Sequence, residues 1–267
     1  MRLEGCVALV TGASAGIGRE FARQLAGRAD ALVLVARREE RLRQLRAELL
    51  GLHPKLRVEI HQTDLSQAAA VEELLEWLRR LGLTIDLLIN NAGLGDIGAF
   101  ATSDPARNRL IVEVNMVALT QLTRALLPPM IESGRGGILN VSSSASFLPI
   151  PNFAVYAATK AYVTSFSEAL RSELRGSGVH VSALCPGPVR TEFQAQARRK
   201  GAPAQTEEPA IAYVAVEKVV AAALKAIERN RPVVIPGLVM KVGMCLVRLT
   251  PLPLLRLAGR LSTKSRT

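Results

Sequence analysis

The chain has 267 residues, of which 49% are hydrophobic and 21% charged, and its formal net charge is +11. These values are typical of a globular protein with a sizeable core, exclude a disordered or collagen-like chain, and suit one domain. Cys6, Cys185 and Cys245 form neither a disulfide framework nor a metal-ligand spacing, so we expect no metal site and a reducing compartment.

Short apolar runs of strand character recur along the chain and alternate with segments of helical spacing. Continuous Val/Ile/Leu runs are typical of strands that are buried on both faces. Their alternation with helices predicts an α/β fold, a single Rossmann-type doubly wound parallel sheet of about seven strands. We expect one domain over residues 1–267, with a C-terminal helical extension. The runs are residues 6–10, 31–36, 56–60, 86–90, 137–141, 179–184 and 231–235.

A glycine-rich turn, TGASAGIGREF, follows the first run. Gly12, Gly16 and Gly18 lie there between a strand and a helix, where glycine permits positive φ and close backbone approach. The free N–H groups at the start of a helix attract a pyrophosphate. This context predicts a dinucleotide site, with a tight turn that binds no ligand as the alternative.

The residues after the second run indicate which dinucleotide is bound. NAD-binding folds usually place an acidic residue at this strand end to bind the ribose 2′-hydroxyl. Here the position is Ala36, and Arg37 and Arg38 follow it. The planar guanidinium of Arg37 matches a 2′-phosphate, which predicts NADP. We expect Arg38 to be a solvated residue at the start of a basic helix.

Tyr156 and Lys160 lie four residues apart in the sequence VYAATKA, which has helical character. Residues four apart share one face of a helix, with Cβ atoms about 6 Å from each other. A phenol beside an ammonium group is either a packing pair or an acid with a labile proton. A tyrosine titrates near pH 10 in water, and a nearby positive charge favours the phenolate, so we expect Lys160 to lower the pKa of Tyr156.

Motifs over residues 5–235 resemble, in order, those of the short-chain dehydrogenase/reductase family. The resemblance implies hydride transfer between a nicotinamide and an alcohol/ketone pair. A single Tyr/Lys pair is weak support for this, whereas the complete set is specific. The motifs are TGASAGIG (11–18), TDL (63–65), NNAG (90–93), EVNMVA (113–118), NVSSSAS (140–146), YAATK (156–160) and PGPVRT (186–191).

The resemblance also implies roles for individual residues. Tyr156 is the general acid/base. The family spacing of thirteen residues before this tyrosine selects Ser143, and not Ser142 or Ser144, as the residue that binds the substrate oxygen. Lys160 holds the nicotinamide ribose, and Asn115 positions a water that connects Lys160 to solvent. The implied contacts of NADP or NADPH are Gly12, Ser14, Ile17, Gly18, Arg37, Asp64, Leu65, Asn91, Tyr156, Lys160 and Thr191.

Three segments are expected to wall the substrate pocket: residues 94–100, 147–153 and 191 to about 212. The second, FLPIPNF, is nearly all apolar, which favours a small apolar carbonyl or alcohol substrate, although Phe147 and Phe153 are equally compatible with the core. Reduction of a 3-ketoacyl thioester (carrier protein or CoA) is the alternative reaction. A non-catalytic nucleotide-binding regulator or scaffold is the alternative class of function; such proteins usually lose the tyrosine or the lysine.

The family resemblance implies pairing of two long helices, about residues 105–130 and 153–176, across a two-fold axis. Both segments carry more apolar positions than one buried face requires. A moderately exposed helix side that contacts no other chain is the alternative. We therefore expect a homodimer or homotetramer.

Basic residues are concentrated towards the C-terminus. Residues 1–189 carry 20 basic and 18 acidic side chains, residues 190–267 carry 14 and 5, and no acidic residue follows Glu228. In the amphipathic stretch 238–267, Pro251 and Pro253 predict two short helical segments with a kink. We expect its leucines to cover the pocket or a partner subunit, with peripheral contact to anionic lipid as the alternative.

The tail lacks the interleaved aromatic residues of a nucleic-acid stacking platform, so no nucleic-acid partner is expected. The first apolar run is too short for a signal peptide, and no stretch reaches about 18 uncharged apolar residues. We therefore expect a cytoplasmic protein, peripheral to a membrane if the tail binds lipid.

Overall fold

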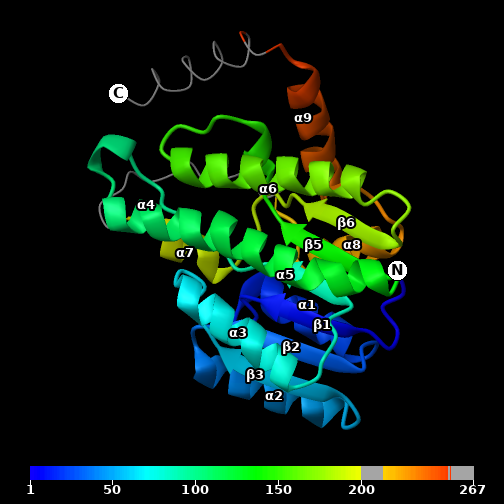
Figure 1. The fold of residues 1–267 in the computed structure, drawn as a ribbon. Coiled ribbons are helices and arrows are strands. Elements are labelled where there is room, and N and C mark those ends of the chain that lie inside the picture. Colours follow the sequence, from blue (N-terminus) through cyan, green and yellow to red (C-terminus); the bar gives the residue numbers. More distant parts are fainter. Residues whose placement is uncertain (200–212, 252, 254–267) are drawn as a thin grey trace.

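The computed structural model describes residues 1–199, 213–251 and 253, and its centre is a seven-stranded sheet (Figure 1). All neighbouring strands pair in parallel, in the order β3-β2-β1-β4-β5-β6-β7. This confirms the predicted doubly wound sheet. The strands are β1 (Val7–Thr11), β2 (Ala31–Ala36), β3 (Arg57–Gln62), β4 (Leu87–Asn90), β5 (Gly136–Val141), β6 (Val179–Leu184) and β7 (Val233–Val234).

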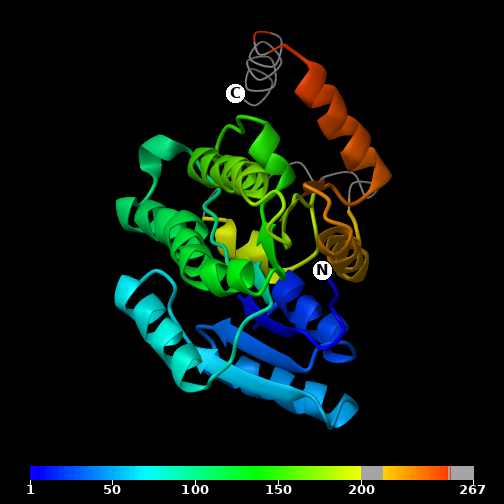
Figure 2. The ribbon, with the colours of Figure 1, turned by 45° about the vertical axis from the view of Figure 1, so that its right-hand side comes forward.

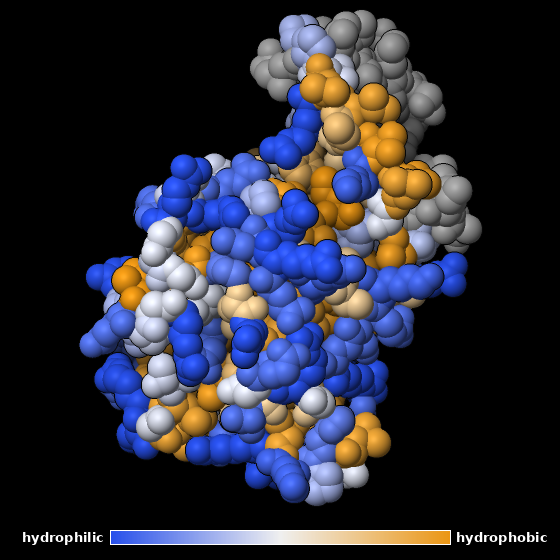
Figure 3. All heavy atoms as spheres, turned by 90° about the vertical axis from the view of Figure 1, so that its right-hand side faces the viewer, coloured by the Kyte–Doolittle hydropathy of each residue, from blue (hydrophilic) through white to orange (hydrophobic). Residues whose placement is uncertain are grey.

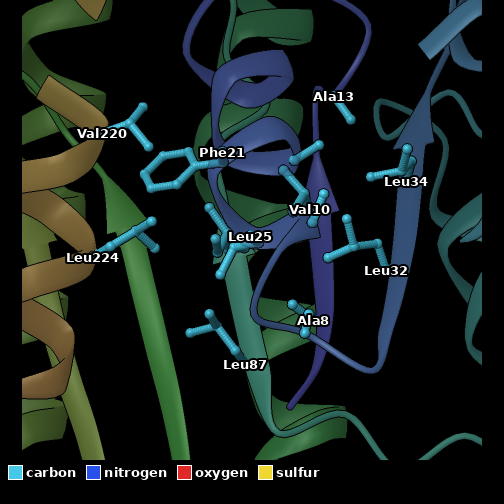
Figure 4. Packing of buried hydrophobic residues seen from close by; sticks show 14 of the residues in the cluster. Ala8, Val10, Ala13, Phe21, Leu25, Leu32, Leu34, Leu87, Val220 and Leu224 are labelled. Atoms are coloured by element: carbon cyan, nitrogen blue, oxygen red, sulfur yellow. The ribbon is translucent and has the colours of Figure 1, made fainter. Parts of the chain in front are cut away.

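Helices cover both faces of the sheet (Figure 2). One hydrophobic cluster joins the sheet to α1, α2 and α8, and a second joins its other face to α3, α5 and α6. In Figure 4, Phe21 and Leu25 of α1 lie between the strands and Val220 of α8. The α-helices are α1 (Gly16–Ala26), α2 (Glu39–Leu52), α3 (Ala68–Arg80), α4 (Pro105–Val112), α5 (Leu119–Glu132), α6 (Ala154–Glu173), α7 (Glu192–Ala197), α8 (Val216–Glu228) and α9 (Leu238–Leu249).

The strand order reverses between β1 and β4, which are the first and fourth strands along the chain but neighbours in the sheet. In open parallel sheets of this kind, ligands bind in the crevice at the carboxyl ends of the strands, at such a reversal. The topology therefore locates the site where the glycine turn after β1 faces the residues after β4 and β5.

A π-helical segment, η2 (Glu113–Ala118), joins α4 to α5 in one continuous helix from Pro105 to Glu132. By length and composition this helix is apolar enough to cross a membrane, a test that core helices of water-soluble proteins also pass. Here Leu122 and Leu126 pack into the cluster against the sheet, so one side of this helix belongs to the core. Two short 3₁₀ turns, η1 (Phe100–Thr102) and η3 (Ser144–Phe147), complete the described elements.

Candidate active site

A cleft of about 560 Å³ opens at the carboxyl ends of the central strands. Eleven of the thirteen residues assigned from the sequence line it, although their motifs are spread over 180 residues of chain. Gly18 and Asn115 are not among the lining residues. The residues that do line it are Gly12, Ser14, Ile17, Arg37, Asp64, Leu65, Asn91, Ser143, Tyr156, Lys160 and Thr191.

The glycine turn is fixed to the strand beside it by Asn91. The Asn91 amide donates to the Thr11 carbonyl oxygen over 2.9 Å, and the Thr11 hydroxyl accepts from the Asn91 backbone N–H over 2.9 Å. Gly12 has a φ of 67°, in the left-handed region that favours glycine. At Gly12 the turn therefore presents bare backbone to the cleft.

Gly18 does not line the cleft and packs closely against the glycine turn, and its contact with the cofactor stays a prediction. It is buried in α1, and a Cβ atom there would lie within 3.0 Å of the Gly12 carbonyl oxygen and of the Asn91 amide. Only glycine lets the first turn of α1 approach the loop this closely.

Arg37 and Arg38 both line the cleft, but their surroundings differ. Within the described chain, the exposed Arg37 guanidinium has no hydrogen bond or ion pair, so it is free to bind a ligand. Arg38 lies at the start of α2 and is partly exposed, as expected, but its guanidinium is also bound. It donates to Ser14 Oγ over 3.3 Å and to the Glu192 carboxylate over 2.8 Å. Hydrogen bonds from Arg38 and Arg41 lower the pKa of Glu192.

Other sequence-assigned side chains are held by local hydrogen bonds along the cleft. Asp64 Oδ1 accepts from the Ser66 N–H over 3.1 Å, and Leu65 is buried beside it. Thr191 caps α7, because its hydroxyl accepts from the Phe193 N–H over 3.4 Å. These bonds fix the floor and one edge of the cleft.

Tyr156 is buried between two aromatic rings. It stacks on Phe153 at 4.2 Å between centroids, and Phe193 of α7 lies at 5.3 Å. Burial raises the pKa of Tyr156 to about 12, while a hydrogen bond with Ser143 acts in the opposite direction. We expected Lys160 to lower the pKa of Tyr156, but among the effects of the protein's own groups the loss of hydration of the phenolate dominates and the pKa is raised. At neutral pH the phenol carries its proton.

Lys160 is also buried, with its Nζ donating to the Val141 carbonyl oxygen over 2.7 Å. Nζ lies 5.7 Å from the centroid of the Tyr156 ring. Burial lowers the pKa of Lys160 to about 8, because the ammonium form loses its hydration. The pair four residues apart on α6 therefore does face one small volume.

Asn115 lies in the π-helical turn behind the cleft. Its amide donates to Leu94 O over 3.0 Å and to Thr159 Oγ1 over 2.9 Å, and its Oδ1 accepts from the Leu94 N–H over 2.8 Å. Gly93 separates it from the lysine, because a Cβ at that residue would lie 3.4 Å from Lys160 Nζ and 3.5 Å from Asn115 Oδ1. In this structure Asn115 positions the loop after β4.

The three serines that follow β5 have different surroundings. Ser142 is buried and bonds to the Lys160 carbonyl and the Thr164 hydroxyl, so its hydroxyl is used inside the fold. Ser143 lines the cleft beside Tyr156, and its Oγ accepts from the Ala145 N–H over 3.1 Å. Ser144 also lines the cleft, but it is the Ser143 hydroxyl that opposes the rise in the pKa of Tyr156.

The apolar end of the cleft is formed by Leu94, Ile97, Ile150, Phe153 and Phe193. Its wall includes parts of all three segments expected from the sequence, of which residues 200–212 lie outside the described chain. Phe147 is the exception. It does not line the cleft, and the Arg248 guanidinium of α9 lies over its ring at 5.3 Å.

Sequence reasoning missed the contacts that hold α7 over this end of the cleft. The Asp96 carboxylate accepts from Arg199 Nε over 2.7 Å, and Ile97 pairs with Arg198 in an isolated parallel bridge. Glu192 binds Arg38 and Arg41 at the other end of α7. These partners are more than 100 residues apart in sequence, and no local pattern marks them.

Residues 6–202 match a family model described as short chain dehydrogenase. The chain belongs to the short-chain dehydrogenase/reductase family. It is 38% identical to an NADP-dependent 3-hydroxy acid dehydrogenase of Escherichia coli (strain K12) over 194 residues, which are 70% of this chain and 74% of that protein.

Solved structures of short-chain dehydrogenases share its fold. A short-chain dehydrogenase of Sphingobium yanoikuyae in complex with NADPH is 36% identical, with a TM-score of 0.79 over 87% of this chain and 88% of that one. A bulky-bulky ketone specific alcohol dehydrogenase of Comamonas testosteroni is 33% identical, with a TM-score of 0.75 over 87% and 86%.

Proposed function

We propose that this short-chain dehydrogenase is an NADP(H)-dependent oxidoreductase that acts on the alcohol/ketone pair of an apolar substrate, with Tyr156 as general acid/base. One observation carries the proposal. Ser143, Tyr156 and Lys160 line one cleft that contains both the glycine turn and an apolar end, and they form the junction between these two parts. A regulator or scaffold that only bound nucleotide would not need this junction.

The chemistry of the cleft fits the proposed cofactor. The turn at Gly12 and the N-terminus of α1 offer backbone N–H groups to a pyrophosphate, and α1 has no acidic residue in its first turn. Asp64, Leu65 and Arg37 all line the cleft, which supports the proposal that Asp64 and Leu65 hold the adenine and Arg37 a 2′-phosphate. When bound, a nicotinamide supplies the hydride.

The protein's own residues hold and move the proton. The phenol of Tyr156 is neutral at pH 7 and is the proton donor to a carbonyl oxygen, while the Ser143 hydroxyl orients that oxygen. Lys160 holds the ribose end of the cofactor and is the buried cation nearest the tyrosine ring. Asn115 keeps the loop beside Lys160 in place, and we propose that a water on its Oδ1 side connects Lys160 to solvent.

The apolar end of the cleft supports an aliphatic or aromatic carbonyl compound as the substrate. A phosphate or carboxylate substrate would need a basic side chain in the wall of this apolar end. Among the described residues that line the cleft around Phe153 and Phe193 there is none. The bulky-ketone specificity of the Comamonas enzyme agrees with this assignment. The 3-hydroxy acid dehydrogenase of Escherichia coli supports a 3-ketoacyl compound as the second candidate.

The decisive assay follows NADPH oxidation at 340 nm with a panel of ketones, which includes alkyl aryl ketones, a steroid ketone and a 3-ketoacyl thioester. We expect the highest kcat/KM with an uncharged apolar ketone. A preference for the thioester would establish the second candidate. NADPH binding by titration, together with no turnover of any compound, would contradict an enzymatic role.

Arg37 is expected to determine the preference for NADP(H). Arg37→Ala should weaken NADPH binding by about 1–3 kcal/mol, the loss for a charge-assisted hydrogen bond, and leave NADH binding nearly unchanged. Isothermal titration with both cofactors measures this difference. Arg43→Ala is the matched control, because Arg43 is an exposed arginine of α2 whose guanidinium binds Glu39 on the same helix. Equal losses for both cofactors would show that Arg37 supports the fold instead.

We further propose that the protein is a cytoplasmic homodimer or homotetramer. The outer side of the helix from Pro105 to Glu132 supports this assembly, because Val112, Val117 and Ile131 are exposed on it. The neighbouring outer side of α6 carries exposed alanines and serines, which permit close helix packing.

A further inference from the structure

The helix α9 has two apolar faces, and only one of them packs against the protein. On the inner face Met244 is buried, and Met240 lies so close to Gly187 that a Cβ there would come within 2.8 Å of Met240 Cγ. Arg248 anchors the far end, over the ring of Phe147 and 3.6 Å from the Glu168 carboxylate. These contacts hold the helix against the wall of the cleft and against η3.

The outer face of α9 carries a continuous apolar stripe. Leu238, Val242, Cys245 and Leu249 follow the spacing i, i+4, i+7, i+11, which places them on one side of an α-helix, and Val239 and Leu246 lie beside them. Five of the ten large hydrophobic residues that are exposed in the described chain lie on this helix of 12 residues. Figure 3 shows apolar side chains gathered along α9. The outer stripe consists of Leu238, Val239, Val242, Cys245, Leu246 and Leu249.

The part of the sequence that contains α9 is strongly basic. Residues 229–267 contain eight lysines and arginines and no acidic residue. Lys241 is exposed beside the stripe, about one helical turn from Leu238 and from Cys245. An apolar stripe in a basic segment complements a surface with an apolar interior and anionic groups at its boundary with water.

We propose that the outer stripe of α9 binds the protein to the surface of an anionic lipid bilayer, independently of the reaction catalysed. A helix of 12 residues is about 18 Å long, so it lies in the headgroup region with the stripe immersed. The inner face stays on the protein, so docking does not require α9 to detach. The basic segment after α9 adds electrostatic attraction to the same surface.

Two other partners fit the outer stripe less well. A stable interface between two copies of the chain uses about 20–30 residues on each side, whereas the stripe offers six. A nucleic acid would require aromatic side chains for stacking, and residues 229–267 contain none. Charge complementarity and size therefore both favour lipid.

Vesicle co-sedimentation of the full-length protein tests the proposal. We expect binding to vesicles of phosphatidylglycerol and phosphatidylcholine (3:7), weak binding to phosphatidylcholine alone, and a marked loss in 0.5 M NaCl. Leu246→Glu should reduce binding to the anionic vesicles at least about tenfold, because a charge replaces an immersed leucine. Leu52→Glu is the matched control, since Leu52 is an equally exposed leucine at the end of α2, and it should bind like the unmodified protein.

Cys245 provides an independent readout of contact depth. It is exposed on the stripe, whereas Cys6 and Cys185 are buried, so a bimane label attaches at residue 245. We expect its emission to shift to the blue with anionic vesicles and to stay unchanged with neutral ones. Replacing Arg256, Arg260, Lys264 and Arg266 by glutamine should weaken binding about fivefold for each charge removed.

Three results would overturn the proposal. The first is no sedimentation with anionic vesicles, and the second is sedimentation that Leu246→Glu leaves unchanged. The third is a dimer in light scattering that Leu246→Glu converts to monomer without any vesicle binding, which would assign the stripe to a second copy. Thermal melts of each variant establish that it is folded, which is expected for Leu246→Glu and Leu52→Glu because both leucines are exposed.

Discussion

Tyr156→Phe is expected to lower kcat for ketone reduction by about 10²–10⁴-fold, the contribution of a positioned general acid. The change removes only the hydroxyl, and the ring keeps its contacts with Phe153 and Phe193. The affinity for NADPH should therefore stay within about twofold of the original value, which is a much smaller change in free energy than the loss in kcat represents. Steady-state kinetics and a fluorescence titration of NADPH measure the two quantities separately.

Tyr162→Phe is the control for this substitution. Tyr162 lies on the same helix, but its hydroxyl bonds to Thr120 over 2.8 Å and does not face the cleft. We expect Tyr162→Phe to retain kcat and to lose about 0.5–1.5 kcal/mol of stability at most. Near-normal turnover by Tyr156→Phe would remove the tyrosine from the mechanism, and equal losses in both variants would indicate a defect of α6 as a whole.

The sheet could be predicted from sequence because its physical signal is local. A strand buried on both faces needs a continuous apolar run, and each of the seven runs coincides with a strand to within about two residues. The largest difference is β7, which is only Val233–Val234 instead of residues 231–235. Pro232 and Pro236 flank it, and proline has no N–H to donate to the ladder with β6.

The cleft could be predicted because parallel strands bring their carboxyl ends to one edge. The motifs at the ends of β1, β2, β4 and β5 therefore converge, and eleven of the assigned residues line one space. Fold topology does not reveal how two groups within that space affect each other. The pKa of Tyr156 depends on its burial, to which the packing of Phe153 and Phe193 contributes.

Side-chain pairs that are distant in sequence were beyond prediction for a similar reason. Arg38 was assigned to solvent because it opens a basic helix, yet its guanidinium binds Glu192 of α7. The sequence of the tail shows alternating apolar and basic residues but not the direction in which each faces. Residues 238–249 form the first expected helix and end before Pro251, while the second expected segment lies outside the described residues.

Gly18→Ala is expected to affect stability and cofactor binding together. The added Cβ would lie within 3.0 Å of the Gly12 carbonyl oxygen and the Asn91 amide, both of which are fixed by the β1–β4 junction. Relief requires α1 to move away from the loop, which disturbs the packing of Phe21 in the core. We expect a loss of about 1–3 kcal/mol in the free energy of unfolding, the usual cost of overpacking.

The same displacement should reduce the affinity for NADPH at least about tenfold, because it shifts the N–H groups at the start of α1 from their anion-binding position. Urea unfolding and a titration with NADPH measure the two losses. Gly51→Ala is the control: Gly51 lies in α2, and a Cβ there would meet no atom within 4 Å. Since alanine is the better helix former, Gly51→Ala should stabilise the protein by up to about 1 kcal/mol and leave NADPH binding unchanged. Unaltered stability and affinity in Gly18→Ala would show that the contact between α1 and the glycine turn is looser than this packing implies.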